Sequence, residues 1–137
     1  MQIGFIGIGL MGFPMAKNLL KSGYKLKVFN RSQDKAERLK EFGAEISTSI
    51  KDAVTNSDII ITMLTDDTAV EKVMSSNEFV KNIKSNTTVI DMSSINPTLS
   101  KKFAKVLKEK NINYLDAPVS GGTLGCLLYT SPSPRDA

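Results

Sequence analysis

The feature that most constrains the fold is a glycine motif close to the start of the chain. Gly7-x-Gly9-x-x-Gly12 directly follows the apolar run Ile3–Ile6, and a segment with helical periodicity begins inside it. Gly7 permits a tight turn, Gly9 lets the backbone approach a ligand, and Gly12 lets helix and strand pack closely. A strand, this turn and a helix, in that order, predict a βαβ unit whose turn binds phosphate.

Short apolar strands alternate with helical segments along the chain, which is typical of a parallel sheet covered on both faces. The expected strands are Ile3–Ile6, Leu26–Phe29, Ile59–Met63, Thr88–Asp91 and Tyr114–Asp116. The expected helices run from about Leu10–Lys21, Gln33–Phe42, Ile50–Val54, Thr68–Met74 and Pro97–Lys110. We therefore predict an α/β domain of the Rossmann type, with a doubly wound and mainly parallel sheet.

Two further patterns support these helices. Gly23 and Gly43 follow the first two predicted helices, where a C-terminal glycine cap is common. In the last predicted helix, an apolar stripe suited to docking on a sheet is formed by Leu99, Phe103, Val106 and Leu107.

The composition narrows the classes of function. The 137 residues, 41% hydrophobic and 23% charged, suit one globular domain. The chain has no histidine and one cysteine, Cys126, which excludes disulfides, cysteine–histidine metal sites and imidazole-based triads. No apolar run approaches the roughly 20 residues of a membrane span, and no signal peptide is evident. We expect a cytoplasmic protein without a membrane partner, and a mitochondrial location of the full-length product stays open.

The net charge of +4 does not by itself indicate a nucleic-acid partner. Many of the lysines belong to the last predicted helix, namely Lys101, Lys102, Lys105, Lys108 and Lys110. They are interspersed with acidic and apolar residues, so we interpret them as a solvated face. Nucleic-acid binding would need a basic patch joined to groove-reading or aromatic elements, which the sequence does not offer.

The end of the second predicted strand indicates which dinucleotide is preferred. Proteins that choose NAD usually carry a carboxylate there for the ribose hydroxyls. This chain instead has Asn30-Arg31-Ser32, in which a neutral amide, a guanidinium fork and a hydroxyl would accommodate a 2′-phosphate. We predict NADP rather than NAD. The alternatives are that Ser32 only caps the next helix and that Arg31 is an ordinary surface charge.

Four segments resemble the β-hydroxyacid dehydrogenases, which include 3-hydroxyisobutyrate dehydrogenase and tartronate semialdehyde reductase and are related to 6-phosphogluconate dehydrogenase. The first is Gly4-Phe-Ile-Gly-Ile-Gly-Leu-Met-Gly-Phe-Pro-Met-Ala-Lys-Asn-Leu19. The others are Met63-Leu64, Asp91-Met-Ser-Ser-Ile-Asn-Pro97 and Asp116-Ala-Pro-Val-Ser-Gly-Gly122. The resemblance covers residues 2–125.

The resemblance implies a set of site residues. Those expected to bind the cofactor are Gly7, Ile8, Gly9, Leu10, Met11, Gly12, Asn30, Arg31, Ser32, Met63, Leu64 and Ser94. Those expected to hold a substrate carboxylate are Ser120, Gly121 and Gly122, with Ser120 also the one catalytic-site position. Ser94 as a plain cap or turn before Pro97, and residues 118–122 as a plain Pro/Gly turn, are the alternatives.

The family's chemistry is reversible hydride transfer between a nicotinamide and a small 3-hydroxyacid or its semialdehyde. Its catalytic lysine lies in an all-helical C-terminal domain, through which the family forms homo-oligomers. No lysine of this chain matches that motif, so we expect the fragment to be inactive and to lack that domain. A non-enzymatic NADP-binding reader or scaffold and an imine-reductase-like enzyme remain alternatives.

We expect residues 1–122 to form the NADP-binding domain and 123–125 to begin an interdomain segment. Residues 126–137 have neither periodicity nor a helix start. Their sequence from Cys126 to Asp136 is similar to one reading frame of a transposase-based sequencing adapter, and we expect that origin for the tail. A natural Pro/Ser-rich tail is the alternative.

Overall fold

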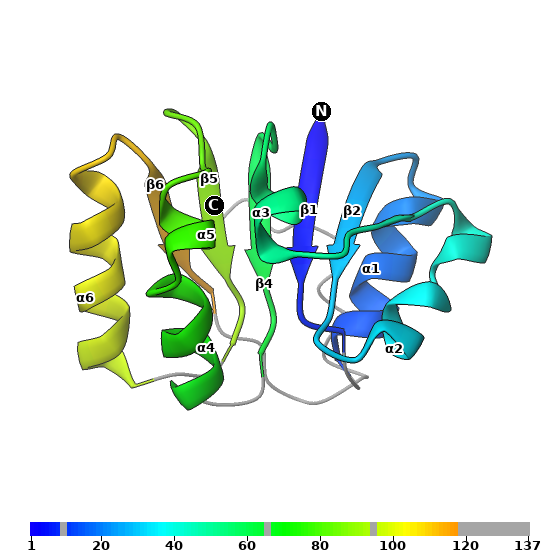
Figure 1. Cartoon of the computed structure of the whole chain (residues 1–137), viewed down its shortest axis with the longest axis horizontal. Helices are drawn as coiled ribbons and strands as arrows, with labels where there is room; N and C mark the ends of the chain where they lie inside the picture. Colours follow the sequence, from blue (N-terminus) through cyan, green and yellow to red (C-terminus); the bar gives the residue numbers. More distant parts are fainter. Residues whose placement is uncertain (9–10, 65–66, 94–95, 118–137) are drawn as a thin grey trace.

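A computed structural model describes residues 1–8, 11–64, 67–93 and 96–117 of the chain. Within them, six strands form one parallel sheet in the order β3-β2-β1-β4-β5-β6 (Figure 1). The strands are β1 Gln2–Ile6, β2 Lys25–Phe29, β3 Glu45–Ile46, β4 Ile59–Thr62, β5 Thr88–Asp91 and β6 Asn113–Asp116. The predicted Rossmann-type α/β architecture is confirmed, and β3 is a strand that the sequence did not predict.

Helices connect the strands as expected, with two differences. They are α1 Gly12–Lys21, α2 Gln33–Glu37, the 3-10 segment η1 Lys40–Phe42, α3 Ile50–Val54, α4 Asp67–Met74, α5 Asn77–Val80 and α6 Pro97–Lys108. The short helix α5 was not predicted. The single helix expected over residues 33–42 is two pieces.

The interruption after α2 has a local cause. The amide of Leu39 donates to the carbonyl oxygen of Ala36 at 3.0 Å, and that of Phe42 donates to Leu39 at 3.0 Å. This three-residue spacing is that of a 3-10 helix, which is common where an α-helix ends. Leu39 is completely buried, and Gly43 ends the segment with φ +101°. The tighter winding thus carries the chain from the buried Leu39 into β3.

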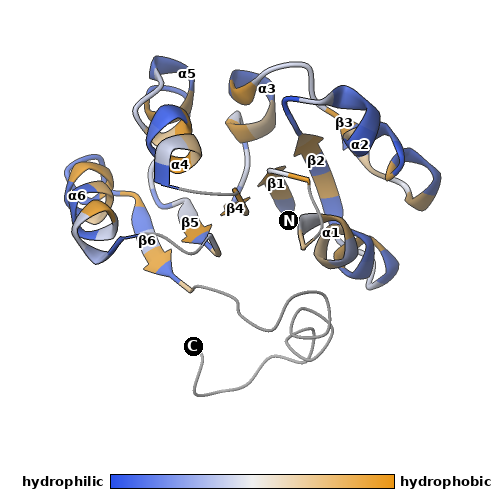
Figure 2. Cartoon of the chain, turned by 90° about the horizontal axis from the view of Figure 1, so that it is seen from below, coloured by the Kyte–Doolittle hydropathy of each residue, from blue (hydrophilic) through white to orange (hydrophobic). Residues whose placement is uncertain are grey.

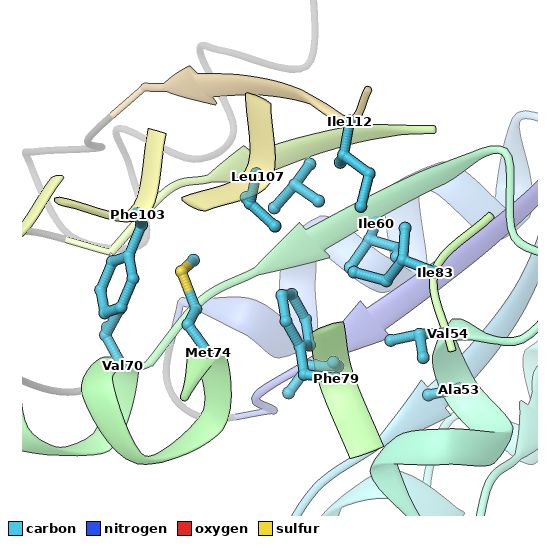
Figure 3. Packing of buried hydrophobic residues seen from close by; sticks show 12 residues of the cluster. Ala53, Val54, Ile60, Val70, Met74, Phe79, Ile83, Phe103, Leu107 and Ile112 are labelled. Carbon is cyan, nitrogen blue, oxygen red and sulfur yellow. The ribbon is translucent and has the colours of Figure 1, made fainter. Parts of the chain in front are cut away.

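Two hydrophobic clusters cover the two faces of the sheet. The first brings together α3, α4, α5 and α6 with alternate residues of β1, β4 and β5. Figure 3 shows side chains of this cluster, with Phe79 of α5 close to Met74 of α4. The second cluster joins α1 and α2 to the other face, through β1, β2 and β4. Figure 2, which looks along the strands, shows α1 on one side and α3 and α4 on the other.

Helix α6 corrects one residue of the predicted apolar stripe. Phe103 and Leu107 are buried, but Val106 is 37% exposed. Ser100, at 8% exposure, takes its place on the buried face, because positions 100, 103 and 107 follow the helical repeat and 106 lies beside them. The helix stops two residues earlier than predicted, since Asn111 adopts φ +61° and Ile112 donates back to the Leu107 carbonyl at 3.0 Å. The five predicted surface lysines are exposed.

Candidate functional site

The strand ends place the predicted site residues at one edge of the sheet. Every strand is parallel to its neighbours, so all carboxyl ends lie at the edge drawn at the bottom of Figure 1. Strand order reverses at β1, which has β2 on one side and β4 on the other. In open α/β sheets, ligands bind in the crevice at such a reversal. The loops after β1, β2 and β4 border this crevice.

Gly7 forms the tight turn that its place in the motif predicts. Its φ is +102°, a conformation that favours glycine, and a Cβ atom there would collide with the Met63 carbonyl oxygen. The same Cβ would lie 3.0 Å from Cδ2 of Leu64. Gly12 is similarly confined, because its Cβ would collide with the Gly7 carbonyl oxygen. The turn therefore lies directly against the loop after β4, with no room for a side chain.

The N-terminus of α1 fits an anionic ligand. The first amides of a helix have no partners within it and form the positive end of the helix dipole. The first turn of α1 contains no acidic residue that would repel an anion. Pro14 occupies the first turn, where its missing amide hydrogen leaves no helical bond unmade. These features match the pyrophosphate of a dinucleotide.

Asn30 connects the two loops that border the dinucleotide site. Its Oδ1 accepts a hydrogen bond from the Ile8 amide at 2.8 Å. Its Nδ2 donates to the Ser32 carbonyl oxygen at 2.9 Å. The sequence indicated only that this position lacks a carboxylate. The structure adds that the Ile8 amide is already engaged by this side chain.

Arg31 and Ser32 present their side chains to solvent at the same edge. Both residues are exposed, and within the described ranges Arg31 forms no ion pair. Ser32 lies at the N-cap position of α2 but its hydroxyl makes no capping hydrogen bond. The Ser32 hydroxyl therefore does not make the capping bond that the alternative for this residue would give it. The exposure of Arg31 agrees with a phosphate contact and equally with an ordinary surface charge.

A buried polar cluster, which the sequence did not reveal, lies at the ends of β4 and β5. Asp91 is completely buried, and its Oδ1 accepts hydrogen bonds from Thr62 Oγ1 at 2.9 Å and the Ser93 amide at 3.0 Å. Its Oδ2 accepts a longer bond from the Tyr114 hydroxyl at 3.4 Å. Burial raises the pKa of the Asp91 carboxyl, and burial also raises the pKa of Tyr114. Cluster members come from sequence positions up to 52 apart, so no local pattern signals it.

Six predicted site residues lie outside the described part of the chain. They are Gly9, Leu10, Ser94, Ser120, Gly121 and Gly122. The described ranges contain no group of three or more acidic, histidine or cysteine residues arranged to hold a metal ion.

Comparison with known proteins decides the family. Residues 2–129 match the family model described as the NAD binding domain of 6-phosphogluconate dehydrogenase. The chain belongs to this family. The family resemblance noted in the sequence is thereby confirmed, together with its nucleotide-binding Rossmann domain.

Two curated relatives are dehydrogenases named for L-serine and for 3-hydroxyisobutyrate. The NAD-dependent L-serine dehydrogenase of Pseudomonas aeruginosa is 42% identical over 130 residues, which is 94% of this chain and 44% of that protein. The mitochondrial 3-hydroxyisobutyrate dehydrogenase of Rattus norvegicus is 40% identical over 121 residues, which is 88% of this chain and 36% of that protein. The chain thus spans less than half the length of these relatives.

Solved structures give the same fold with two different cofactors. The 3-hydroxyisobutyrate dehydrogenase of Mycobacterium tuberculosis with L-serine has a TM-score of 0.84 at 30% identity, covering 90% of this chain and 42% of that one. An imine reductase from Myxococcus stipitatus with NADP⁺ has a TM-score of 0.83 at 28% identity, with coverages of 90% and 42%. A variant enzyme from the same organism was solved with NAD⁺, at a TM-score of 0.82 and 25% identity, with coverages of 89% and 42%. The family fold therefore accommodates either nucleotide.

No helix in the described ranges has the length and apolar character needed to cross a bilayer.

Proposed function

We propose that this chain is the NADP(H)-binding part of an oxidoreductase that transfers a hydride between the nicotinamide and a small 3-hydroxyacid or its semialdehyde. The observation that carries the proposal is the glycine turn, whose backbone at Gly7 lies against Met63 and Leu64 and leads into α1, a helix with no acidic residue in its first turn. A bound nicotinamide supplies the hydride, or accepts it. This chain's residues bind and orient the nucleotide.

Each part of the nucleotide has candidate partners. The turn from Gly7 to Gly12, which includes Gly9, Leu10 and Met11, would hold the pyrophosphate with backbone amides and the dipole of α1. Ile8 would support it through packing, because Ile8 is buried and its amide is bonded to Asn30. Met63, Leu64 and Ser94 would border the nicotinamide half on the β4 and β5 side of the crevice.

The preference for NADP over NAD rests on Arg31 and Ser32. The loop after β2 borders the adenosine half of the site, where a carboxylate would bind ribose hydroxyls and repel a 2′-phosphate. The exposed Arg31 guanidinium would instead bind that phosphate in a charge-assisted contact, and the uncommitted Ser32 hydroxyl would add a hydrogen bond.

The substrate is a small carboxylate by analogy with the relatives. Two of them carry the names of 3-hydroxyacids, L-serine and 3-hydroxyisobutyrate. Ser120, Gly121 and Gly122 would bind the carboxylate through a hydroxyl and backbone amides. No lysine of the chain matches the family's catalytic motif, so the 137-residue chain would bind nucleotide without turning over substrate. Dehydrogenase activity of the purified chain would contradict this part of the proposal.

Nucleotide titration tests the proposal. The purified chain is titrated calorimetrically with NADPH and with NADH at low salt, alongside the variants Arg31→Ala and Arg38→Ala. Arg38 is also exposed and lies at the end of α2, so it controls for loss of one positive charge. Arg31→Ala should weaken NADPH binding about tenfold or more and change NADH binding little. Equal losses for both nucleotides would contradict the NADP assignment, and an unliganded wild-type chain would overturn the proposed function.

An imine-reductase-like activity is the second candidate, favoured by the similarity of fold to the Myxococcus stipitatus enzyme. Curated dehydrogenases match at 40–42% identity, against 28% for that imine reductase, so we prefer the hydroxyacid substrate.

A further inference from the structure

Three buried groups form a continuous chain of hydrogen bonds at the ends of β4 and β5. The Leu64 amide donates to Ser93 Oγ at 2.7 Å. Ser93 in turn donates its own amide to Asp91 Oδ1, at 3.0 Å, and Thr62 Oγ1 donates to the same oxygen at 2.9 Å. Ser93 is 1% exposed, and Thr62 and Asp91 are 0% exposed. The loop after β4 is therefore held by the loop after β5 through side chains sealed from water.

The residue held in this way borders the crevice. Leu64 lies beside the glycine turn, since a Cβ on Gly7 would be 3.0 Å from its Cδ2. A dinucleotide crosses the crevice with one half on each side of the strand reversal. The adenosine half belongs on the β2 side, with Arg31, which leaves the β4 side and Leu64 to the nicotinamide half.

A second hydrogen bond joins the same two loops farther along. The Asn96 amide donates to Asp67 Oδ1 at 3.1 Å. This bond is exposed, so water competes for both groups and it holds the loops less firmly than the buried Ser93 contact. Backbone bonds also hold this region, since Met63 donates to the Ile6 carbonyl oxygen at 2.9 Å and Met92 to that of Thr62 at 2.8 Å. Beyond them, Ser93 provides the buried side-chain contact to Leu64 itself.

We propose that Ser93, anchored by Asp91, is a positioning residue that fixes the Leu64 wall of the crevice for the nicotinamide half of the cofactor. The inference rests on the proposed function. It assigns to Ser93 a task that differs from direct contact with the nucleotide, because its hydroxyl and its amide are both bonded within the protein.

A comparison of two ligands separates positioning from general stability. NADPH contains both halves, whereas adenosine 2′,5′-bisphosphate contains the 2′-phosphate half without the nicotinamide. Ser93→Ala should weaken NADPH binding about tenfold and leave binding of the bisphosphate within about twofold of wild type. Both affinities are measured by calorimetry on the full 137-residue chain.

Ser57→Ala is the matched control. Ser57 is also completely buried and its hydroxyl donates to the Ala53 carbonyl oxygen at 2.8 Å, but it precedes β4 at the opposite edge of the sheet. This control should leave the ratio of the two affinities unchanged. A Ser93→Ala variant that loses both ligands equally, or neither, would overturn the positioning role. A wild-type chain that binds neither ligand would overturn the proposed function and this inference with it.

Two further measurements keep the test decisive if Ser93→Ala does not fold. Asp91→Asn retains an oxygen that accepts from Thr62 and Ser93, so its affinity for NADPH should stay within about threefold of wild type. Asp91→Ala should lose affinity for NADPH and keep its affinity for the bisphosphate. In the wild-type chain, NADPH should slow hydrogen exchange of the peptide containing Leu64, and the bisphosphate should not. Equal protection by both ligands would contradict the assignment of Leu64 to the nicotinamide side.

Discussion

The Oδ1 atom of Asn30 lies 2.8 Å from the amide nitrogen of Ile8, across 22 positions of sequence. Through its other amide atom, the same side chain holds the Ser32 carbonyl oxygen. The glycine turn and the loop proposed for the 2′-phosphate are therefore fixed to each other. An aspartate could accept from Ile8, but it could not donate to Ser32, so this contact selects an amide.

Asn30→Asp tests whether this position acts as a link or as a selector of nucleotide. If the link matters, the variant should weaken NADPH and NADH binding together and lower the free energy of unfolding by about 1–2 kcal/mol. Asn82→Asp is the matched control, because Asn82 Nδ2 donates to the Glu78 carbonyl oxygen at 2.8 Å away from the site. A gain in NADH affinity, as expected of a ribose-binding carboxylate, would show that the residue selects the nucleotide instead.

Gly7→Ala should be much more harmful than Gly23→Ala. Both glycines have a positive φ, but a Cβ at Gly7 would collide with Met63, whereas a Cβ at Gly23 has no atom within 4 Å. Gly23→Ala should therefore cost only the conformational strain, about 1–2 kcal/mol. Gly7→Ala should cost about 3 kcal/mol or more in urea unfolding, because displacement of the β4 loop is added. Similar losses in the two variants would show that the contact with Met63 is easily relieved.

Ser47→Ala should be neutral or stabilising. Ser47 is 1% exposed, and its hydroxyl has no hydrogen-bond partner in the described structure. Removal of an unpaired buried hydroxyl relieves a desolvation cost of about 1 kcal/mol. Ser57→Ala breaks a buried hydrogen bond, and should destabilise by about 1 kcal/mol. Thermal unfolding of the two variants provides the comparison, and a loss of stability in Ser47→Ala would indicate a bound water on its hydroxyl.

Asp91 should make stability depend on pH. Burial raises the pKa of its carboxyl above the ordinary 3.8, so the folded state holds the proton more tightly than the unfolded state. Stability from this group is present at low pH and falls as pH rises from about 4 through the folded-state pKa. Asp91→Asn does not titrate, and its stability relative to wild type should rise over the same window in urea unfolding.

Asp58 supplies the control of opposite sign for that experiment. Its pKa is lowered, mainly by the hydrogen bond from Lys84 and then by that from the Gln2 amide. The stability that the Asp58 carboxylate contributes is present above about pH 4 and is lost as pH falls through its folded-state pKa. Asp58→Asn should therefore become less stable relative to wild type as pH rises through that range. The same trend in both variants would contradict the effect assigned to burial of Asp91.

Local constraints explain what the sequence predicted well. The first strand, the glycine turn and α1 depend on residues that are adjacent in sequence. The positive φ of Gly7 and the close packing of Gly12 both require the absence of a Cβ. The short elements β3 and α5 depend on packing instead. Helix α5 has four residues and is held by the fully buried Phe79, which no periodicity reveals. Two residues of β3 are too few for an alternating pattern.

The candidate site shows the same difference between features set by local sequence and features set by long-range packing. Arg31 and Ser32 follow from position, since the end of the second strand is known once the strands are placed. The bonds of Asn30 to Ile8 and of Ser93 to Leu64 join residues 22 and 29 positions apart. Only packing of the strands side by side brings these partners together. The sequence therefore indicated Asn30, Ile8 and Leu64 without their contacts, and it did not single out Ser93.

The strand order bears on how the sheet forms while the chain is being synthesised. Each new strand joins a free margin of the sheet: β2 joins β1, β3 joins β2, β4 joins the other side of β1, and β5 and β6 extend that side in turn. No strand has to enter between two that are already paired. Because synthesis delivers the strands in sequence order, each strand can add to this sheet without breaking pairings already formed.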